Sequence, residues 1–208
     1  MTTMLELRAI RCERGGRTLF DNLNCQVAAG QLLRVRGVNG SGKTSLLRTV
    51  CGLMPPAQGR VLWRGESLAD LAEEFGRQLV YLGHAAALKD DLTALENLQA
   101  ACLLGGLYVA PGHASAALAQ AGLPGRERVV ARHLSQGQRR RVALARLVLA
   151  TSAPLWVLDE PFNALDDAAG DWLCGLIAAQ LGRGGVVVLT SHQNVGLDGF
   201  PGQVSVAL

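Results

Sequence analysis

The sequence predicts an α/β fold built on a mostly parallel sheet. Short runs rich in apolar residues alternate along the chain with longer segments of helical character, and this order favours parallel strands covered by helices. The runs expected to form core strands are 32–36, 79–82, 155–158 and 186–189. Polar side chains follow several of these runs directly, and binding sites in open α/β sheets lie beyond the carboxyl ends of the strands. A functional site is therefore expected along that edge of the sheet.

The N-terminal part of the chain predicts a separate antiparallel unit. Residues 4–11 and 18–27 alternate apolar and polar side chains, and the turn-forming stretch 14–17 (Arg-Gly-Gly-Arg) lies between them. This arrangement is typical of a β-hairpin. A further short strand is expected over 61–63. We therefore expect an N-terminal antiparallel β subdomain ahead of the core.

The first core strand leads into a glycine-rich loop. Eight consecutive residues fit the pattern G-x-x-x-x-G-K-[ST], namely Gly37, Val38, Asn39, Gly40, Ser41, Gly42, Lys43 and Thr44. Strand 32–36 precedes the loop and an expected helix over 44–53 follows it, which is the context that this phosphate-binding motif requires. Backbone N–H groups of such a loop, together with the positive end of the helix, can hold a polyphosphate. The sequence therefore predicts a P-loop that binds a polyphosphate, and the rest of the chain must indicate the reaction.

Three side chains at the end of this loop have individual roles in the prediction. Lys43 adds a compact positive charge for the outer phosphates, and the Thr44 hydroxyl can ligate Mg²⁺. Ser45, the next residue, is counted with the nucleotide-binding residues. The alternative is a chance glycine-rich turn, which is disfavoured because every fixed position of the motif is met in the right context.

The middle of the chain predicts a helical subdomain inserted into the core. Thr93 and Glu96 have the spacing of a capping box, so a helix should begin there and run to about Leu104. A second helix is expected over 113–121. Because both helices lie between core strands in the sequence, we assign residues 84–150 to a helical subdomain.

Two further helices are expected in the second half of the chain. One runs from Gln136 to Ala150, with an apolar side (Val142, Ala145, Leu149) and a basic side (Arg139, Arg140, Arg141). The other covers 167–181, and run 186–189 follows it as the expected last core strand.

An acidic pair ends one of the buried strands. Asp159 and Glu160 come directly after run 155–158. Such a pair is often only a cap. Downstream of a P-loop, however, it indicates that Asp159 binds Mg²⁺ and that Glu160 is the general base for the attacking water. His192 follows strand 186–189 in the same way. A lone histidine is more often structural, yet this position makes a γ-phosphate contact plausible.

A second candidate anion site lies at the start of helix 136–150. Ser135 can cap this helix, and Gly137 inside the first turn permits close backbone approach. An ordinary cap would explain the serine but not the glycine. The link Ala164–Asp166 after the acidic pair is uninformative in isolation.

Composition restricts the class of function. The 208 residues predict one domain, residues 1–208. With 4% aromatic residues and a net charge of +3, the chain does not indicate nucleic-acid binding. The five cysteines do not have the spacing of a metal site or of a C-x-x-C redox pair. The N-terminal residues do not have the charged-then-apolar pattern of a signal peptide. No apolar run reaches the roughly 18 residues that a membrane span requires. We expect a cytoplasmic, soluble chain whose membrane role requires a partner.

Taken together, these motifs resemble the nucleotide-binding subunit of ABC transporters. Residues 37–44 are similar to Walker A, 155–160 to Walker B, 134–138 to the signature motif, 164–166 to the D-loop and His192 to the switch histidine. The resemblance implies an ABC ATPase fold, ATP and Mg²⁺ as ligands, and a head-to-tail homodimer. Each ATP would then also be contacted by residues of the opposing subunit, namely Ser135, Gln136, Gly137, Gln138 and Asp166.

Three positions depart from the general ABC pattern. Gln136 stands in the signature where glycine is commonest. Arg14 replaces an aromatic residue that usually stacks on adenine, although a guanidinium can also stack on a base. His84 replaces the glutamine of the Q-loop, which contacts the membrane subunit. These replacements concern the adenine contact and the coupling geometry.

A narrower resemblance is to the ATP-binding subunits of the cytochrome c maturation system, a heme-exporter subfamily. It is carried by segments 12–14, 18–20, 83–84, 92–98, 139–147 and 191–193. This resemblance implies a peripheral protein on the cytoplasmic face of the inner membrane. Its partners would be integral membrane subunits of a cytochrome c maturation complex, contacted through His84 and the loop after it. ATP hydrolysis would drive heme export or release of a heme chaperone.

Other functions are compatible with parts of the sequence. An ABC exporter subunit for another substrate is the main alternative. A soluble ABC-type ATPase acting on DNA or ribosomes is disfavoured, because the chain has one nucleotide domain and no sustained heptads. A binding module without turnover is disfavoured because Glu160 and His192 are both present.

Overall fold

The computed structural model describes residues 2–191, 200 and 202–208. Its strands form two sheets. One is antiparallel, with the order β2-β1-β4-β5, and consists of β1 (Thr3–Arg14), β2 (Arg17–Ala28), β4 (Gln58–Trp63) and β5 (Glu66–Ser67). The other is parallel, with the order β6-β7-β8-β3-β9, and consists of β3 (Leu32–Arg36), β6 (Leu79–Leu82), β7 (Leu155–Leu158), β8 (Val186–Thr190) and β9 (Gln203–Ala207).

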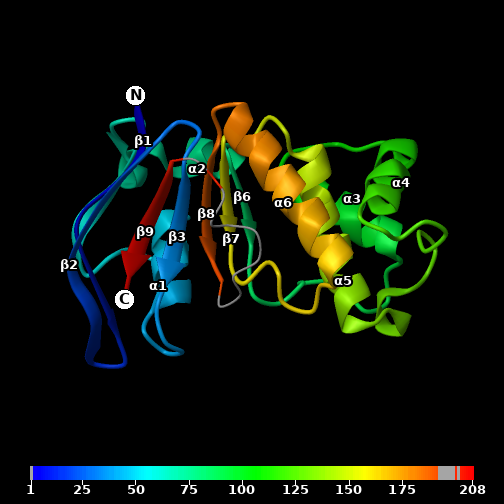
Figure 1. Ribbon diagram of the computed structural model, residues 1–208, viewed down its shortest axis with the longest axis horizontal. Coiled ribbons are helices and arrows are strands. Elements are labelled where there is room, and N and C mark those ends of the chain that lie inside the picture. Colours follow the sequence, from blue (N-terminus) through cyan, green and yellow to red (C-terminus); the bar gives the residue numbers. More distant parts are fainter. Residues whose placement is uncertain (1, 192–199, 201) are drawn as a thin grey trace.

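Two apolar layers cover the two faces of the parallel sheet. Leu155 and Val157 of β7 face a core shared with the antiparallel sheet and with helix α1 (Lys43–Val50), whereas Trp156 and Leu158 face a core shared with α5 (Gln136–Leu149) and α6 (Asp167–Gly182). Figure 1 shows the antiparallel sheet on one side of the parallel sheet and helix α6 on the other. Because β7 is buried on both faces, its sequence is a continuous apolar run rather than an alternating one.

Three helices form a lobe with a core of its own. They are α3 (Ala94–Leu104), α4 (Pro111–Gln120) and α5, and they share a cluster that includes Leu98, Leu118 and Val142. The predicted capping box at the start of α3 is confirmed, because the Thr93 hydroxyl accepts from the Glu96 N–H at 3.2 Å and the Glu96 carboxylate accepts from the Thr93 N–H at 2.8 Å. The lobe lies at the end of the molecule opposite the antiparallel sheet (Figure 1).

The structure contains elements that the sequence did not predict, among them β5, β9 and α2 (Leu68–Arg77). Strand β8 is not the last core strand, because β9 pairs in parallel with β3 at the sheet edge. An edge strand is partly exposed, so its sequence Gln-Val-Ser-Val-Ala alternates polar and apolar residues instead of forming an apolar run. Helix α2 lies in a stretch for which no element was expected, and Ser67 caps it by accepting from the Ala69 N–H at 3.4 Å.

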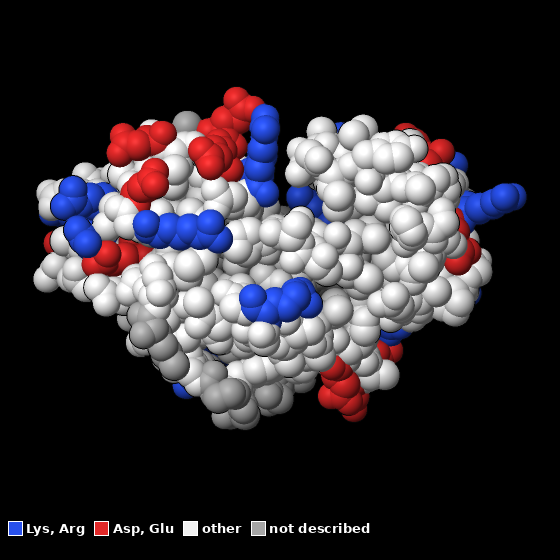
Figure 2. Space-filling model, turned by 90° about the horizontal axis from the view of Figure 1, so that it is seen from above, with Lys and Arg blue, Asp and Glu red and all other residues white. Residues whose placement is uncertain are grey.

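The surface carries charges of both signs. Figure 2 shows one face on which lysine and arginine side chains are interspersed with aspartate and glutamate. In the described part of the chain, no helix combines the length and the apolar character that crossing a bilayer requires.

Candidate active site

The carboxyl ends of the parallel strands point to one edge of the sheet (Figure 1), and a cavity of about 510 Å³ lies there. Its lining residues are Arg14, Leu19, Asn39, Gly40, Gly42, Lys43, Thr44, Ser45, His84, Asp159, Glu160 and Asn163. The cavity therefore brings together the glycine-rich loop, the acidic pair, and two of the residues that depart from the general ABC pattern, Arg14 and His84. Leu19 and Asn163 were not expected to line the cavity; Leu19 lies in segment 18–20 of the narrower resemblance, whereas no motif in the sequence marks Asn163.

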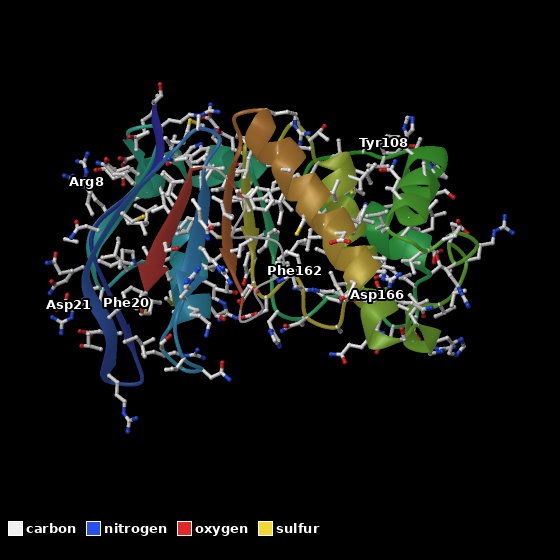
Figure 3. The ribbon with its side chains drawn as sticks, in the orientation of Figure 1. Arg8, Phe20, Asp21, Tyr108, Phe162 and Asp166 are labelled. Carbon is white, nitrogen blue, oxygen red and sulfur yellow. The ribbon has the colours of Figure 1, made fainter. Side chains whose placement is uncertain are left out.

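The glycine-rich loop folds tightly ahead of α1. Gly42 has φ 104°, and a Cβ at this position would lie 3.0 Å from a ring carbon of Phe20 on β2, whose side chain Figure 3 shows. Gly37 has φ 154°, and its Cβ would lie 2.9 Å from the carbonyl oxygen of Leu208. Both positions require glycine because of backbone conformation and close contact.

The start of α1 has no side-chain cap. Gly42 is its N-cap residue and offers no side chain, so the first-turn N–H groups face the loop uncapped. The Lys43 ammonium folds back and donates to the carbonyls of Gly37 at 2.8 Å and Val38 at 3.1 Å. An ammonium has three donors, so Lys43 can brace the loop and still donate to a phosphate. The uncapped backbone N–H groups and the Lys43 ammonium together form a candidate anion-binding site.

A hydrogen-bond network joins the loop to the acidic pair. Asp159 is 2% exposed, and its two carboxylate oxygens accept from the hydroxyls of Thr44 and Thr190, each at 2.8 Å. The Thr190 hydroxyl in turn accepts from the Glu160 N–H at 2.8 Å. Thr44 and Asp159 are 115 residues apart in the sequence. Thr190 ends β8 and was not expected to have this role, although its position at the end of a buried strand is a usable signal.

Glu160 has a backbone conformation that is unusual for its residue type. Its φ is 49°, in the left-handed region, and the next residue is Pro161. Left-handed backbone costs a residue with a side chain on the order of 1–3 kcal/mol, and a following proline further favours extended backbone. Surrounding contacts must therefore hold Glu160 in place, and the bond to Thr190 is one of them.

Arg140 corrects one sequence-based expectation. It was assigned to the basic side of its helix, apart from the apolar side, yet it is 4% exposed. Arg140, Leu144 and Leu147 lie at i, i+4 and i+7, so they share the face of α5 that packs on the sheet. Burial lowers the pKa of the Arg140 guanidinium, while the nearby charges of Asp159 and Glu160 act in the opposite direction. Helical spacing could have revealed this position.

The other two arginines of this run form ion pairs. Arg139 pairs with Asp90 at 2.7 Å, and Arg141 pairs with Asp166. Asp166 also caps α6 by accepting from the Ala169 N–H at 2.9 Å, and this bond, together with Arg141, lowers the pKa of the Asp166 carboxyl. Figure 3 shows Asp166 at the end of α6 that lies beside the start of α5.

The signature-like residues lie outside the first cavity. Ser135 caps α5 by accepting from the Gln138 N–H at 3.2 Å, and the Gln138 side chain accepts from the Ser135 N–H at 2.9 Å. A Cβ on Gly137 would lie 2.7 Å from the Ala164 carbonyl oxygen, so the glycine is needed for packing within the chain itself. Gln136 lines a neighbouring cavity of about 600 Å³ that shares His84 and Asn163 with the first. His192 lies outside the described residues.

Comparison with known proteins agrees with this geometry. The ABC transporter family model matches residues 20–163. The cytochrome c biogenesis ATP-binding export protein CcmA of Dechloromonas aromatica is 50% identical, with 93% of this chain and 95% of that protein covered. The protein of the same name from Pseudomonas aeruginosa is 48% identical, with 93% and 95% covered.

Solved structures show the same fold. An ATP-binding subunit of an ABC transporter matches with a TM-score of 0.83 and 26% identity, covering 97% of this chain and 88% of the other. A dimeric ATP-binding cassette in a post-hydrolysis state, bound to ADP and Pi, matches with a TM-score of 0.79 and 26% identity, covering 91% and 88%. The predicted α/β P-loop fold is confirmed. The chain belongs to the ABC transporter family and, within it, to the cytochrome c biogenesis ATP-binding export proteins.

Proposed function

We propose that this chain is the ATP-hydrolysing subunit of an ABC-type membrane complex for c-type cytochrome biogenesis, driving heme export or release of a heme chaperone. The observation that carries the enzymatic part is the contact between Thr44 and Asp159, which joins the phosphate-binding loop to the acidic pair. The biological part is supported by relatives that are about 50% identical over nearly their whole length and are named for cytochrome c biogenesis and export.

The nucleotide would be held by the loop 37–44, Ser45 and Arg14. The loop and the uncapped start of α1 supply N–H groups for the phosphates, and Lys43 supplies the charge. Arg14 lines the cavity in the place where an aromatic residue would stack on adenine, and its guanidinium plane suits the same role.

Mg²⁺ fits the oxygen atoms that converge on Asp159. The Thr44 hydroxyl and one Asp159 carboxylate oxygen lie 2.8 Å apart at the cavity, and both are oxygen ligands of the kind Mg²⁺ prefers. In the described part of the chain no cluster of three or more His, Cys, Asp or Glu side chains could hold a metal, which suits an ion held mainly by water and substrate phosphates. When bound, Mg²⁺ would neutralise charge that develops on the phosphates.

Glu160 would act on the attacking water. It lines the cavity one residue beyond Asp159, and its carboxylate is suited to accept a proton from water as the γ-phosphate bond breaks. His192 would contact the γ-phosphate. Both assignments are proposals from position in the chain and, for Glu160, from its place in the cavity.

A homodimer would complete each site. We assign Ser135, Gln136, Gly137, Gln138 and Asp166 to the ATP bound by the opposing subunit, because they lie outside the first cavity of their own chain. The similar cassette with ADP and Pi is itself a dimer, which supports this arrangement.

The membrane contact would involve His84 and the loop after it. His84 lines both cavities and lies between β6 and α3 in the sequence, so a partner that moved this loop would reach both cavities. We propose integral membrane subunits of a cytochrome c maturation complex as the partners. The chain would bind them peripherally on the cytoplasmic face of the inner membrane, as one domain (1–208) with a helical subdomain over about 84–150.

A test in cells separates this function from a general exporter. Lys43→Ala should abolish c-type cytochromes, whose heme is attached outside the cytoplasm, while cytochromes that bind heme non-covalently in the inner membrane remain. Covalent-heme staining of membrane fractions measures the first, and difference spectra of the same membranes measure the second. Normal c-type cytochromes in a Lys43→Ala strain without a second gene copy would contradict the proposal.

A further inference from the structure

Every N–H of the Arg140 guanidinium is bonded to a backbone carbonyl. A guanidinium has five such donors in a fixed plane. Nη1 donates to Gly83 at 2.8 Å and His84 at 3.3 Å, Nη2 donates to Asp159 at 2.8 Å and Glu160 at 2.8 Å, and Nε donates to Pro161 at 3.3 Å. One side chain of α5 thus binds two separate segments at the edge of the parallel sheet.

The carbonyls that Arg140 binds surround the strained residue of the site. Three of them belong to Asp159, Glu160 and Pro161, so they bracket the left-handed backbone at Glu160 on both sides. The remaining two belong to Gly83 and His84, which directly follow β6, and His84 also lines the nucleotide cavity. These bonds and the one from the Glu160 N–H to Thr190 fix the peptide units from which the Glu160 side chain projects.

We propose that Arg140 is a positioning residue for hydrolysis: it holds the Glu160 backbone in its left-handed conformation and ties it to the His84 loop and to the helix that begins at Ser135. All of its donors are used by carbonyls, so none is left to bind the nucleotide or the attacking water. The inference rests on the proposed ATPase function of the same site.

The chemistry of the side chain makes the proposal specific to arginine. Glutamine at this position has two N–H donors and methionine has none, so most of the five carbonyls, three of them in buried hydrogen bonds, would lose their partner. Lysine keeps the charge and three donors but lacks the planar fork that spreads bonds over separated carbonyls. Loss of hydrolysis should therefore be graded, smallest for lysine, larger for glutamine and largest for methionine.

The test compares steady-state ATP hydrolysis by the full-length chain and its Arg140→Lys, Arg140→Gln and Arg140→Met variants. We expect kcat to fall about tenfold to a hundredfold in Arg140→Gln, the size of effect that a small misplacement of a reacting group produces. The KM for ATP should stay within about threefold, because the residue contributes no ground-state contact to the nucleotide. Binding stoichiometry with MgATP corrects each kcat for the fraction of folded chain.

A second measurement separates positioning of Glu160 from a general loss of structure. If Arg140 acts through Glu160, Arg140→Gln should change single-turnover hydrolysis by less than about twofold when Glu160→Gln is already present, since residues that act as one unit are not additive. Independent, multiplicative losses would overturn the proposal. Arg132→Gln is the matched control, because Arg132 makes an exposed ion pair with Asp91 and should leave kcat unchanged.

The remaining outcomes are also decisive. Near-normal kcat in Arg140→Gln with full MgATP binding would show that the carbonyl contacts are dispensable. Failure of all three variants to bind MgATP stoichiometrically would make Arg140 a residue of the fold and would likewise overturn the inference. Neither result affects the cytochrome experiment with Lys43→Ala, so failure of this inference is distinguishable from failure of the proposed function.

Discussion

Helices α1 and α5 begin in two different ways, although both helix starts are expected to face a nucleotide. Helix α1 begins at Gly42 with no side-chain cap, whereas α5 begins with the reciprocal capping box of Ser135 and Gln138. Uncapped N–H groups are available to a ligand, but at α5 the chain itself already satisfies the Gln138 N–H. The first helix start is thus an open anion site, and the second is a stable helix end that a ligand would have to share.

The surroundings of the two helix starts differ as well, because one is open and the other is packed against the chain. The loop before α1 opens into the cavity that also contains Asp159 and Glu160. The start of α5 packs through Gly137 against the Ala164 carbonyl. The contrast fits the proposal that the loop before α1 binds the phosphates and that the start of α5 adds contacts from another subunit.

The largest effect should come from the first region. Glu160→Gln should still bind MgATP but hydrolyse it at least ~10²-fold more slowly, because the amide cannot accept the proton from water. ATP hydrolysis and gel filtration of the same sample measure this, and an ATP-bound dimer should accumulate. Near-normal turnover would remove Glu160 from the mechanism.

If each nucleotide site is built from both regions, the first region must come from one subunit and the second from its partner. Lys43→Ala damages the first region and Gly137→Asp damages the second, so a mixture of the two variants should contain dimers with one intact site. We expect the mixture to hydrolyse ATP at a rate well above either variant alone. Size-exclusion chromatography with wild-type chain controls for dimerisation. If variants that still dimerise show no ATPase when mixed, the composite geometry is wrong or both sites must work together.

The contrast between the regions also explains what the sequence could predict. The loop 37–44 could be predicted because its function fixes residue types at fixed spacing in a strand–helix context. Thr44 and Asp159 were both expected at the same sheet edge as Mg²⁺ ligands, and the structure brings their side chains into direct contact there. Functional residues that directly follow core strands can therefore be predicted from the sequence alone.

Other features were not predicted because their roles depend on packing within the chain. Arg140 was assigned to the basic side of its helix because of its charge, yet its helical spacing with Leu144 puts it on the buried face. Gly137 was expected to approach a phosphate, but its nearest constraint is the Ala164 carbonyl of its own chain. Strand β9 was missed because an exposed edge strand lacks the apolar run of a central one.

A smaller effect is expected at the base end of the nucleotide in the first region. Arg14 lines the cavity where an aromatic residue would discriminate adenine, so GTP should compete with ATP within about tenfold, a gap of ~1.4 kcal/mol. Competition of unlabelled GTP against a fluorescent ATP analogue measures the ratio, with Arg14→Tyr as the comparison variant. A preference for ATP above about a hundredfold would show that other residues select the base.

The smallest expected effect comes from replacing a helix-capping residue, and it can distinguish a cap from a nucleotide contact. Thr93 at α3 and Ser135 at α5 form the same capping box, but only Ser135 is proposed to contact ATP. Replacing either by alanine should cost about 0.5–2 kcal/mol of stability, since each removes one cap. That cost should lower the melting temperature of both variants by about 2–4 °C per kcal/mol for a chain of this length. At a temperature where both variants are fully folded, only Ser135→Ala should then lose ATPase activity, because its hydroxyl would serve the opposing subunit as well as its own helix. Equal ATPase in the two variants would mean that Ser135 is an ordinary cap and that the second helix start holds the nucleotide, if at all, through its backbone alone.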